Sequence, residues 1–560
     1  MNTMKRILFI LLIAFVFASC SDTFLETQNK NNLDVGSFWK TKTDMELAVN
    51  AAYCPLAYGG MFGLNYFLNL NTLDPYIWFE SPKGGFDQLL INTNDFKSTW
   101  SALYQGLFRT SDILANIEKV RTVVNDDSIF NQNKGQVTAL RGMYYFYMVT
   151  WFNAPIYYDE TDVPTDPMVP LTNGTQEQFW TKLEEDLNFA TTHLPATWPS
   201  SETGRITKGA AYAQLGKALL YKHYHYYLRF GKGSTAEAME NLVKAKTALK
   251  AVIESGNYKL IQSLSNDKTN EQAAILSNFS YLDIPVGTNT YKAENNAESV
   301  WEIQYNDDNR GQGGWLPGWQ WGGNLLNEYF APLPSCYRNL EIDPTLWLKF
   351  EARANAPEGY KTKIDPRAYA TCYIDGDTLD WRKSSGQNVP FQSGINSKKI
   401  VLNNNLFTGS DVLPSKSFGL KKYFYPQWVD KSPLCDPVNV RVIRFADVLL
   451  MYAEVCFQLD GDADGTGLAA LNEVRSRAGM PSKFSLNVEI IVNERTFELA
   501  TEGHHYNDII RWSFDSKFDV VNNLDVLFNS RFNKPKNQYF PIPQTDIDSN
   551  KGALKQNPGW

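Results

Sequence analysis

The stretch KGAAYAQLGKALLYKHYHYY, residues 208–227, together with STAEAMENLVKAKTALKAVIESG, residues 234–256, decides the fold. In both stretches apolar side chains recur every three or four residues, which is the spacing of one face of an α-helix. Ser234 and Glu237 match the pattern of a capping box at the start of the second helix, and Gly256 is suited to end it in a left-handed conformation. The sequence therefore predicts two antiparallel helices.

This pair has the character of a repeat unit. Leu215 and Gly216 in the first helix and the small alanines of the second resemble a tetratricopeptide unit, in which the glycine lets the helices approach closely. Other segments show the same spacing and predict a mainly α-helical scaffold. These segments are 39–53, 100–120, 137–151, 179–194, 442–459, 468–478 and 488–512.

Other parts of the chain lack helical spacing. Residues 59–95 read as loops, and 261–440 is too long for an ordinary loop, so it predicts an inserted, irregular lobe with short helices and strands. The predicted division of the chain is a signal peptide at 1–19, a lipidated tether and lead-in at 20–37, a scaffold at 38–260 and 441–515, the inserted lobe at 261–440, and an extended C-terminal segment at 516–560 that packs on the scaffold.

Composition narrows the class of protein. The 560 residues are 43% hydrophobic and 20% charged, which is typical of a globular chain, and the net charge of −8 disfavours a nucleic-acid partner. The unusual feature of the composition is its aromatic content: 33 Phe, 29 Tyr and 15 Trp make up 14% of the chain. Aromatic side chains fill cores, but they also form surfaces that grip ring-shaped ligands.

The N-terminus indicates export. Lys5 and Arg6 precede an apolar run at 7–18, which has the length of a signal peptide and is too short to span a bilayer. Small residues followed by Cys20 resemble a bacterial lipobox, in which the cysteine becomes the first mature residue and carries the lipids. The alternative is an ordinary signal peptide with an incidental cysteine.

Two tryptophan-containing clusters are the candidate ligand site. Trp315, Trp319 and Trp321 stand among glycines and a proline, where a regular element is not expected to bury all three. Asn324 follows them, and a second cluster contains Asp74, Tyr76 and Trp78. Sugar rings stack their C–H faces on indole, while amides and carboxylates bond their hydroxyls. The alternative is that these aromatics fill the core of the loop lobe itself.

Charged motifs give less support for chemistry. The run Asp460, Asp462, Asp464 and Gly465 copies half of a calcium loop, but the final position is Leu471 where a glutamate is needed. The alternative is an acidic turn that caps backbone N–H groups, so calcium stays a weak candidate and no cofactor is predicted. The helical arginines and carboxylates are expected to form buried ion pairs. They are Arg444, Asp447, Glu454, Glu494, Arg495, Glu498 and Glu502. No catalytic motif is present, and the chain is predicted not to be an enzyme.

Several segments together resemble the SusD/RagB family of starch-utilisation-type outer-membrane lipoproteins. They are VRVIRFADVLLMYAE at 440–454, LNEVRSRAG at 471–479, the run from Glu494 to Trp512, the C-terminal pieces at 539–544 and 556–559, and, upstream, 140–155 and 204–211. His505 stands where the family usually has Arg, and Asn153 where it has Gly.

The resemblance implies a tetratricopeptide-like scaffold of about eight helices with the irregular lobe packed on one side. It also implies a lipid-anchored protein on the outer surface of a Bacteroidota cell. It implies oligosaccharide binding and docking over a SusC-like TonB-dependent barrel that imports the sugar, with the membrane reached through the lipid on Cys20. It also places both aromatic clusters near the sugar-binding face. Two alternatives remain open: binding of peptides or glycopeptides on the same scaffold, as in the RagB branch, and a surface hydrolase.

Overall fold

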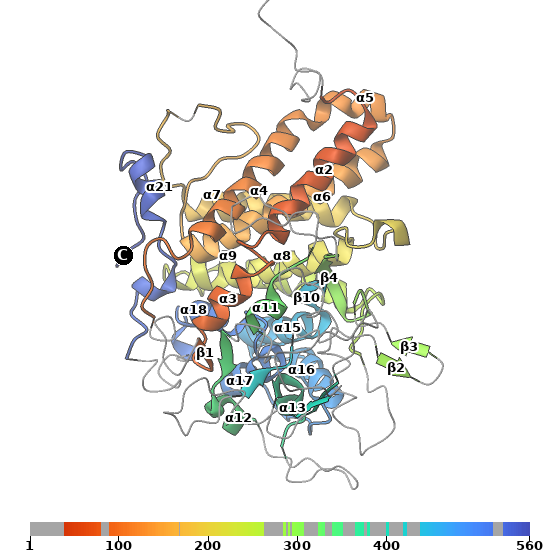
Figure 1. The fold of residues 1–560 in the computed structure, drawn as a ribbon, viewed down its shortest axis with the longest axis vertical. Helices are drawn as coiled ribbons and strands as arrows, with labels where there is room; N and C mark the ends of the chain where they lie inside the picture. Colours follow the sequence, from red (N-terminus) through yellow and green to blue (C-terminus); the bar gives the residue numbers. More distant parts are fainter. Residues whose placement is uncertain are drawn as a thin grey trace, which may run out of the picture.

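The computed structural model describes most of the scaffold and parts of the inserted lobe. The described residues are 38–79, 89–166, 168–261, 284–286, 289–291, 294–306, 323–330, 339–350, 364–373, 378–380, 399–401, 418–422, 437–518 and 530–560. They form a mainly α-helical protein, as predicted (Figure 1). One continuous hydrophobic core runs through both the N-terminal and the C-terminal helices.

The scaffold is built from antiparallel helix pairs. The pairs are α6 (Asp127–Phe152) with α7 (Gln176–His193), α8 (Lys208–Lys222) with α9 (Ala236–Ile253), and α15 (Phe445–Asp460) with α16 (Thr466–Arg477). Gly216 explains how closely α8 and α9 pack, because a Cβ added there would lie 2.5 Å from the Cγ of Leu249. A larger residue would push the two helices apart, so the expected role of this glycine is confirmed.

Other helices extend the scaffold. They are α2 (Lys42–Ala57), α3 (Asn65–Thr72), α4 (Lys97–Asn116), α5 (Arg121–Val124), α17 (Val488–Leu499), α18 (His505–Trp512) and α21 (Gln544–Ser549). Short helices in the lobe are α11 (Leu326–Phe330), α12 (Pro344–Lys349) and α13 (Arg367–Thr371). A π-helical segment, η4 (His223–Leu228), extends α8, and short 3-10 turns include η3 (Ser200–Glu202).

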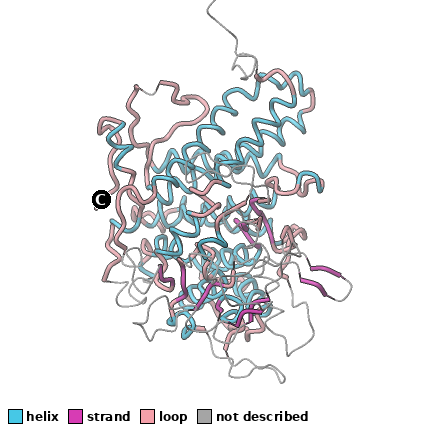
Figure 2. The backbone as a smooth tube through the Cα atoms, viewed as in Figure 1, coloured by secondary structure: helices cyan, strands magenta, loops and turns pink. Residues whose placement is uncertain are grey.

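The described strands belong to small antiparallel sheets. Four of them form one sheet in the order β1 (Ile77–Phe79), β5 (Leu340–Ile342), β9 (Phe418–Leu420) and β6 (Cys372–Tyr373). Three two-stranded sheets pair β4 (Ser299–Ile303) with β10 (Val440–Arg444), β2 (Ile284–Val286) with β3 (Asn289–Tyr291), and β7 (Thr378–Asp380) with β8 (Lys399–Val401). Most of the strands lie in the lower half of the view, around α15 to α17, and the β4–β10 pair lies near the middle, against α8 (Figure 1 and Figure 2). No helix of the described chain is both long and apolar enough to cross a membrane.

Several boundaries differ from the predictions. The stretch expected to be helical from 442 begins as strand β10, because its β-branched residues pair with β4, with Val440 opposite Ile303. The helix expected over 488–512 is two helices, since Thr501 and Gly503 take left-handed conformations between them. Thr235, not Ser234, caps α9 by accepting a hydrogen bond from the N–H of Ala238.

Two stretches expected to be irregular contain regular elements. Residues 59–95 include helix α3 and strand β1, which contact each other and sit against the core through buried side chains such as Phe67 and Ile77. The C-terminal segment, expected to be extended, includes α21. Tertiary contacts settle both segments, whose local spacing carries little signal.

Candidate ligand-binding site

The predicted tryptophan cluster lies outside the described residues. The chain on both sides of it is hydrogen-bonded to the rest of the fold. Before it, the N–H of Tyr305 donates to Oδ1 of Asn439 at 2.9 Å, and the Tyr305 hydroxyl donates to the carbonyl of Ala57. After it, the amide of Asn324 donates to the carbonyl of Val438 at 2.6 Å. The described residues on either side of 307–322 are therefore bonded to two consecutive residues directly before β10.

The second predicted cluster is partly built into the fold. Trp78 lies in strand β1, opposite Glu341 of β5. Asp74 and Tyr76 are only 5% and 4% exposed. Oδ1 of Asp74 accepts the N–H of Tyr76 and lies 3.1 Å from Nδ1 of His505, and the Tyr76 ring stacks on that imidazole.

This placement corrects the interpretation of three predicted ligand-binding residues. Asp74 and Tyr76 fix the turn that leads into β1, and Asn324 is 1% exposed with its amide bonded inside the fold. Asp74 and Asn324 can be buried since their polar atoms form hydrogen bonds with neighbouring backbone groups. His505 thus contacts Asp74 through Nδ1 at a position where the resembling family usually has arginine.

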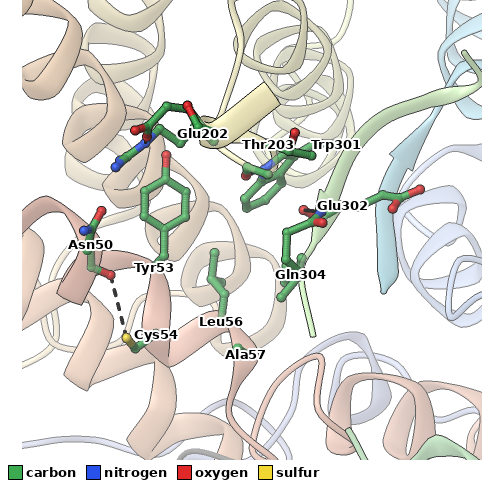
Figure 3. Close-up of a pocket in the computed structure, with 14 residues that line it drawn as sticks. Asn50, Tyr53, Cys54, Leu56, Ala57, Glu202, Thr203, Trp301, Glu302 and Gln304 are labelled. Carbon is green, nitrogen blue, oxygen red and sulfur yellow. Dashed lines mark hydrogen bonds and ion pairs between the residues drawn. The ribbon is translucent and has the colours of Figure 1, made fainter. Parts of the chain in front are cut away.

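A cleft of about 320 Å³ lies between α2, the turn at 201–205 and β4. One wall is α2, which contributes Asn50, Tyr53 and Leu56, and the opposite wall is β4 with the residue after it. Figure 3 shows Tyr53 rising from α2 toward the Glu202 turn, with Trp301 and Gln304 on the facing side. Gln304 lies just before the start of the tryptophan segment, so this cleft borders the point where that segment leaves the described fold.

Hydrogen bonds hold the cleft walls in place. The Tyr53 hydroxyl donates to Oε1 of Gln136 at 2.9 Å and accepts the N–H of Ile206 at 3.2 Å. The indole of Trp301 donates to the carbonyl of Gly204 at 2.9 Å. Gly204 itself has a φ of +95°, and an added Cβ would lie 2.3 Å from the Cγ of Gln304. The cleft is therefore preorganised, with a turn that only glycine fits.

The charges in the cleft are compensated locally. Arg205 forms an ion pair with Glu202 and also donates to Oε1 of Gln136. Glu302 pairs with Arg441 at 3.4 Å. A group of hydrogen-bonding side chains on an apolar floor, without an unpaired charge among the described residues, suits a polar but uncharged ligand.

The helical arginines and carboxylates form buried ion-pair networks, as predicted. Glu498 accepts from Arg444 at 2.7 Å and Arg367 at 3.1 Å, and it also contacts Arg477. A second network joins Arg495 to Asp508 and Asp447, and Arg511 to Asp508 and Glu454. Both networks link helices that are distant in sequence, so these residues lock the C-terminal helices together.

Electrostatics of the first network favour its charged state. Burial alone would raise the pKa of Glu502, but the nearby charges of Arg444 and Lys422 outweigh it and lower the pKa to about 2. The pKa of Glu498 is also lowered, because the attraction of three arginines overcomes the desolvation that opposes it. Carboxylates held charged in this way do not suit general acid chemistry at neutral pH.

The acidic run after α15 acts as a capping turn. Both oxygens of Asp462 accept backbone N–H groups at the start of α16, from Gly467 at 2.7 Å and Leu468 at 2.8 Å. Asp460 accepts from Ala463, and Asp464 accepts from Thr466 and from Nζ of Lys246. The turn alternative therefore accounts for all three carboxylates. Across the part of the chain that the structure describes, no group of three possible ligands is placed to hold a metal ion.

The cleft was not anticipated from the sequence. Its residues come from α2, the 201–205 turn and β4, which are far apart along the chain. Only Gly204 and Arg205 carried a signal, since they belong to a stretch that resembles the family pattern. The spacing of Tyr53 on its helix matches an ordinary partly buried position, and nothing in its neighbours distinguishes it.

Comparisons with known proteins agree with this architecture. Residues 297–560 match the model of the SusD family, and residues 62–226 match a family described as starch-binding associating with outer membrane. A SusD-like protein of Formosa agariphila is 23% identical over 98% of both chains. A SusD-like protein of Bacteroides ovatus is 22% identical over 91% of this chain and 82% of its own.

Solved structures show the same fold. A laminarin-binding SusD-like protein has a TM-score of 0.65 at 24% identity and covers 93% of this chain and 100% of its own. Surface glycan-binding protein A from Bacteroides uniformis has a TM-score of 0.67 at 20% identity, over 92% of this chain and 99% of its own.

Proposed function

Because this chain belongs to the SusD/RagB family, we propose that it is a non-catalytic glycan-binding lipoprotein of the outer membrane that passes oligosaccharide to a SusC-like TonB-dependent barrel. Cys20 carries the lipid anchor, and the ligand is gripped by stacking on loop tryptophans together with polar contacts.

The observation that carries the proposal is the cleft, whose polar and aromatic lining residues are held in place by hydrogen bonds. Gln304 lines the cleft, and the segment holding Trp315, Trp319 and Trp321 begins a few residues later. The described lining already combines fixed polar groups with the rings of Tyr53 and Trp301, which is the composition that a sugar site needs.

The ligand proposal is tested by calorimetry with a panel of plant, algal and microbial glycans. Trp319→Ala and Trp78→Ala are each expected to weaken binding by roughly fivefold to 150-fold, because an aromatic platform contributes about 1–3 kcal/mol to stacking on a flat ligand. Phe484→Ala is the control, since Phe484 is an aromatic side chain that is 98% exposed and lies outside the site. Binding to oligopeptides and to no glycan would overturn the proposal, and release of cleaved products would show a hydrolase.

Anchoring and delivery are tested separately. Cys20→Ala is expected to move the protein from the membrane fraction to the culture fluid or periplasm, since a multiply acylated cysteine is needed for stable attachment. Affinity purification of the lipidated protein is expected to recover a TonB-dependent barrel. Membrane association unchanged in Cys20→Ala would contradict the lipid anchor.

A further inference from the structure

The cleft beside α2 does not stand alone. A second hollow of about 230 Å³ adjoins it. The two share six lining residues: Glu202, Thr203, Gly204, Arg205, Trp301 and Glu302. The two hollows therefore lie against the same six residues. Together they are named the trough, with lobe A on the side lined by α2 and lobe B on the side lined by Trp198, Asn257 and Tyr258.

Each lobe presents an aromatic ring whose position is fixed. In lobe B the indole of Trp198 donates to the carbonyl of Ile206 at 2.8 Å, and the hydroxyl of Tyr258 lies 2.9 Å from Oγ1 of Thr207. In lobe A the Tyr53 hydroxyl accepts the N–H of that same Ile206. The two polar groups of one backbone residue thus hold a ring in each lobe, and both rings remain partly exposed.

The lining of the trough is polar but electrically balanced. Glu202 is paired with Arg205, and Glu302 is paired with Arg441 and accepts the N–H of Asn295. Exposed amides lie at the two ends, Asn50 in lobe A and Asn257 in lobe B, and neither side chain bonds another described residue. Amides both donate to and accept from hydroxyl groups, whereas an ionic ligand would find no spare opposite charge here.

We propose that the trough binds a linear, uncharged oligosaccharide whose sugar rings occupy both lobes. The inference rests on the proposed function for its ligand class, and it adds the location, the neutrality and the extended form of the ligand. Lobe A lies near the lower limit of about 300 Å³ for a small-molecule pocket, and lobe B lies below it. An oligosaccharide longer than either lobe contacts both lobes only if it passes over the six lining residues that they share.

The test uses a length series of the neutral, unbranched glycan that binds best in the panel, measured by calorimetry on the intact protein. Affinity is expected to rise at least tenfold from the shortest binding oligosaccharide to one that spans both lobes. Asn257→Trp, which fills lobe B, is expected to remove that rise and leave the shortest oligosaccharide unaffected. Asn50→Trp is expected to weaken every length. Glu254→Trp is the control, because Glu254 is exposed on the same stretch and lines neither lobe.

The outcomes separate this inference from the function beneath it. Affinity independent of chain length, or a full rise in Asn257→Trp, would overturn the trough while leaving glycan binding intact. Equal or tighter binding of an acidic glycan such as polygalacturonate would overturn the neutrality of the ligand. Failure to bind any glycan would remove both the proposed function and the trough. Circular dichroism and thermal unfolding establish that each variant is folded, and the milder Asn257→Ala is expected to reduce the rise in part.

Discussion

Two regions of this protein use the same ion-pair chemistry to different ends. Glu498 and the three arginines that it contacts have side chains at most 3% exposed. At the trough, Arg205 and Glu202 are 19% and 40% exposed, and they face a hollow beside the solvent.

The difference shows where to look for function in such a chain. The many charged residues of the C-terminal helices are buried and bond to one another, because a charged side chain can be buried only when it is paired. Residues that face a ligand are fewer and mostly neutral, and their charges are cancelled before a ligand arrives. The density of charged motifs in the sequence is thus a guide to the scaffold rather than to the site.

The largest expected effect comes from breaking the buried network. Glu498→Gln removes the charge that Arg367, Arg444 and Arg477 share, so the free energy of unfolding is expected to fall by about 3–5 kcal/mol. Chemical denaturation followed by circular dichroism measures the loss. Glu254→Gln, at an exposed pair with Lys250, is the matched control and is expected to change stability by less than about 1 kcal/mol. Equal effects of the two substitutions would erase the contrast between the regions.

Acid is expected to weaken the same buried region at a milder pH than its carboxylates require. Burial lowers the pKa of His504 from 6.5 to about 4, against the opposing attraction of Asp447. Between these two values the unfolded chain binds a proton that the folded chain does not. The free energy of unfolding therefore falls as the pH drops from about 6.5 to about 4, by roughly 3 kcal/mol for this residue.

The control for this pH dependence is His504→Gln, which removes one titrating group from the region. Its unfolding free energy is expected to fall less steeply over the same interval, while the buried His223 and His225 keep their own contributions. An unchanged slope would mean that His504 takes up its proton without unfolding.

A smaller effect is expected at the turn between the lobes. Gly204→Ala places a Cβ against Gln304 in a left-handed backbone, which is expected to cost about 1–3 kcal/mol of stability. Gly59→Ala is the comparison, because an added Cβ there meets no atom within 4 Å and stability is expected to change by less than about 0.5 kcal/mol. Thermal unfolding of both variants decides whether the turn is as tightly fitted as its geometry indicates.

The smallest effect is expected from the pair that lines the trough. Glu202→Gln leaves Arg205 with its contact to Gln136 and with access to water, so the loss of stability is expected to be below about 1 kcal/mol. A loss comparable to that of Glu498→Gln, measured by the same denaturation, would show that this pair stabilises the fold as strongly as the buried network does.

The sequence predicted the scaffold well and the site less well. The close pair α8 and α9 followed from the spacing of Leu215, Gly216 and Leu249, because helical periodicity is a local property. Strand β10 was missed, since the stretch around Val442 has an apolar run that fits either a helix or a strand until β4 supplies a partner. The trough depends on α2, the 201–205 turn and β4 meeting in space, which no local pattern contains.

The hydrogen bonds of the residues on either side of 307–322 have a consequence for how the sequence of this stretch can vary. The described residues near its two ends, Tyr305 and Asn324, bond the neighbouring residues Asn439 and Val438, so the fold fixes both ends of this stretch of chain. Lengthening such an insert costs only about 0.6 kcal/mol of chain entropy per doubling. Exchanging residues 307–322 for a stretch of different sequence or length is therefore expected to leave the packing of the helices unchanged, so that ligand preference can vary independently of the scaffold.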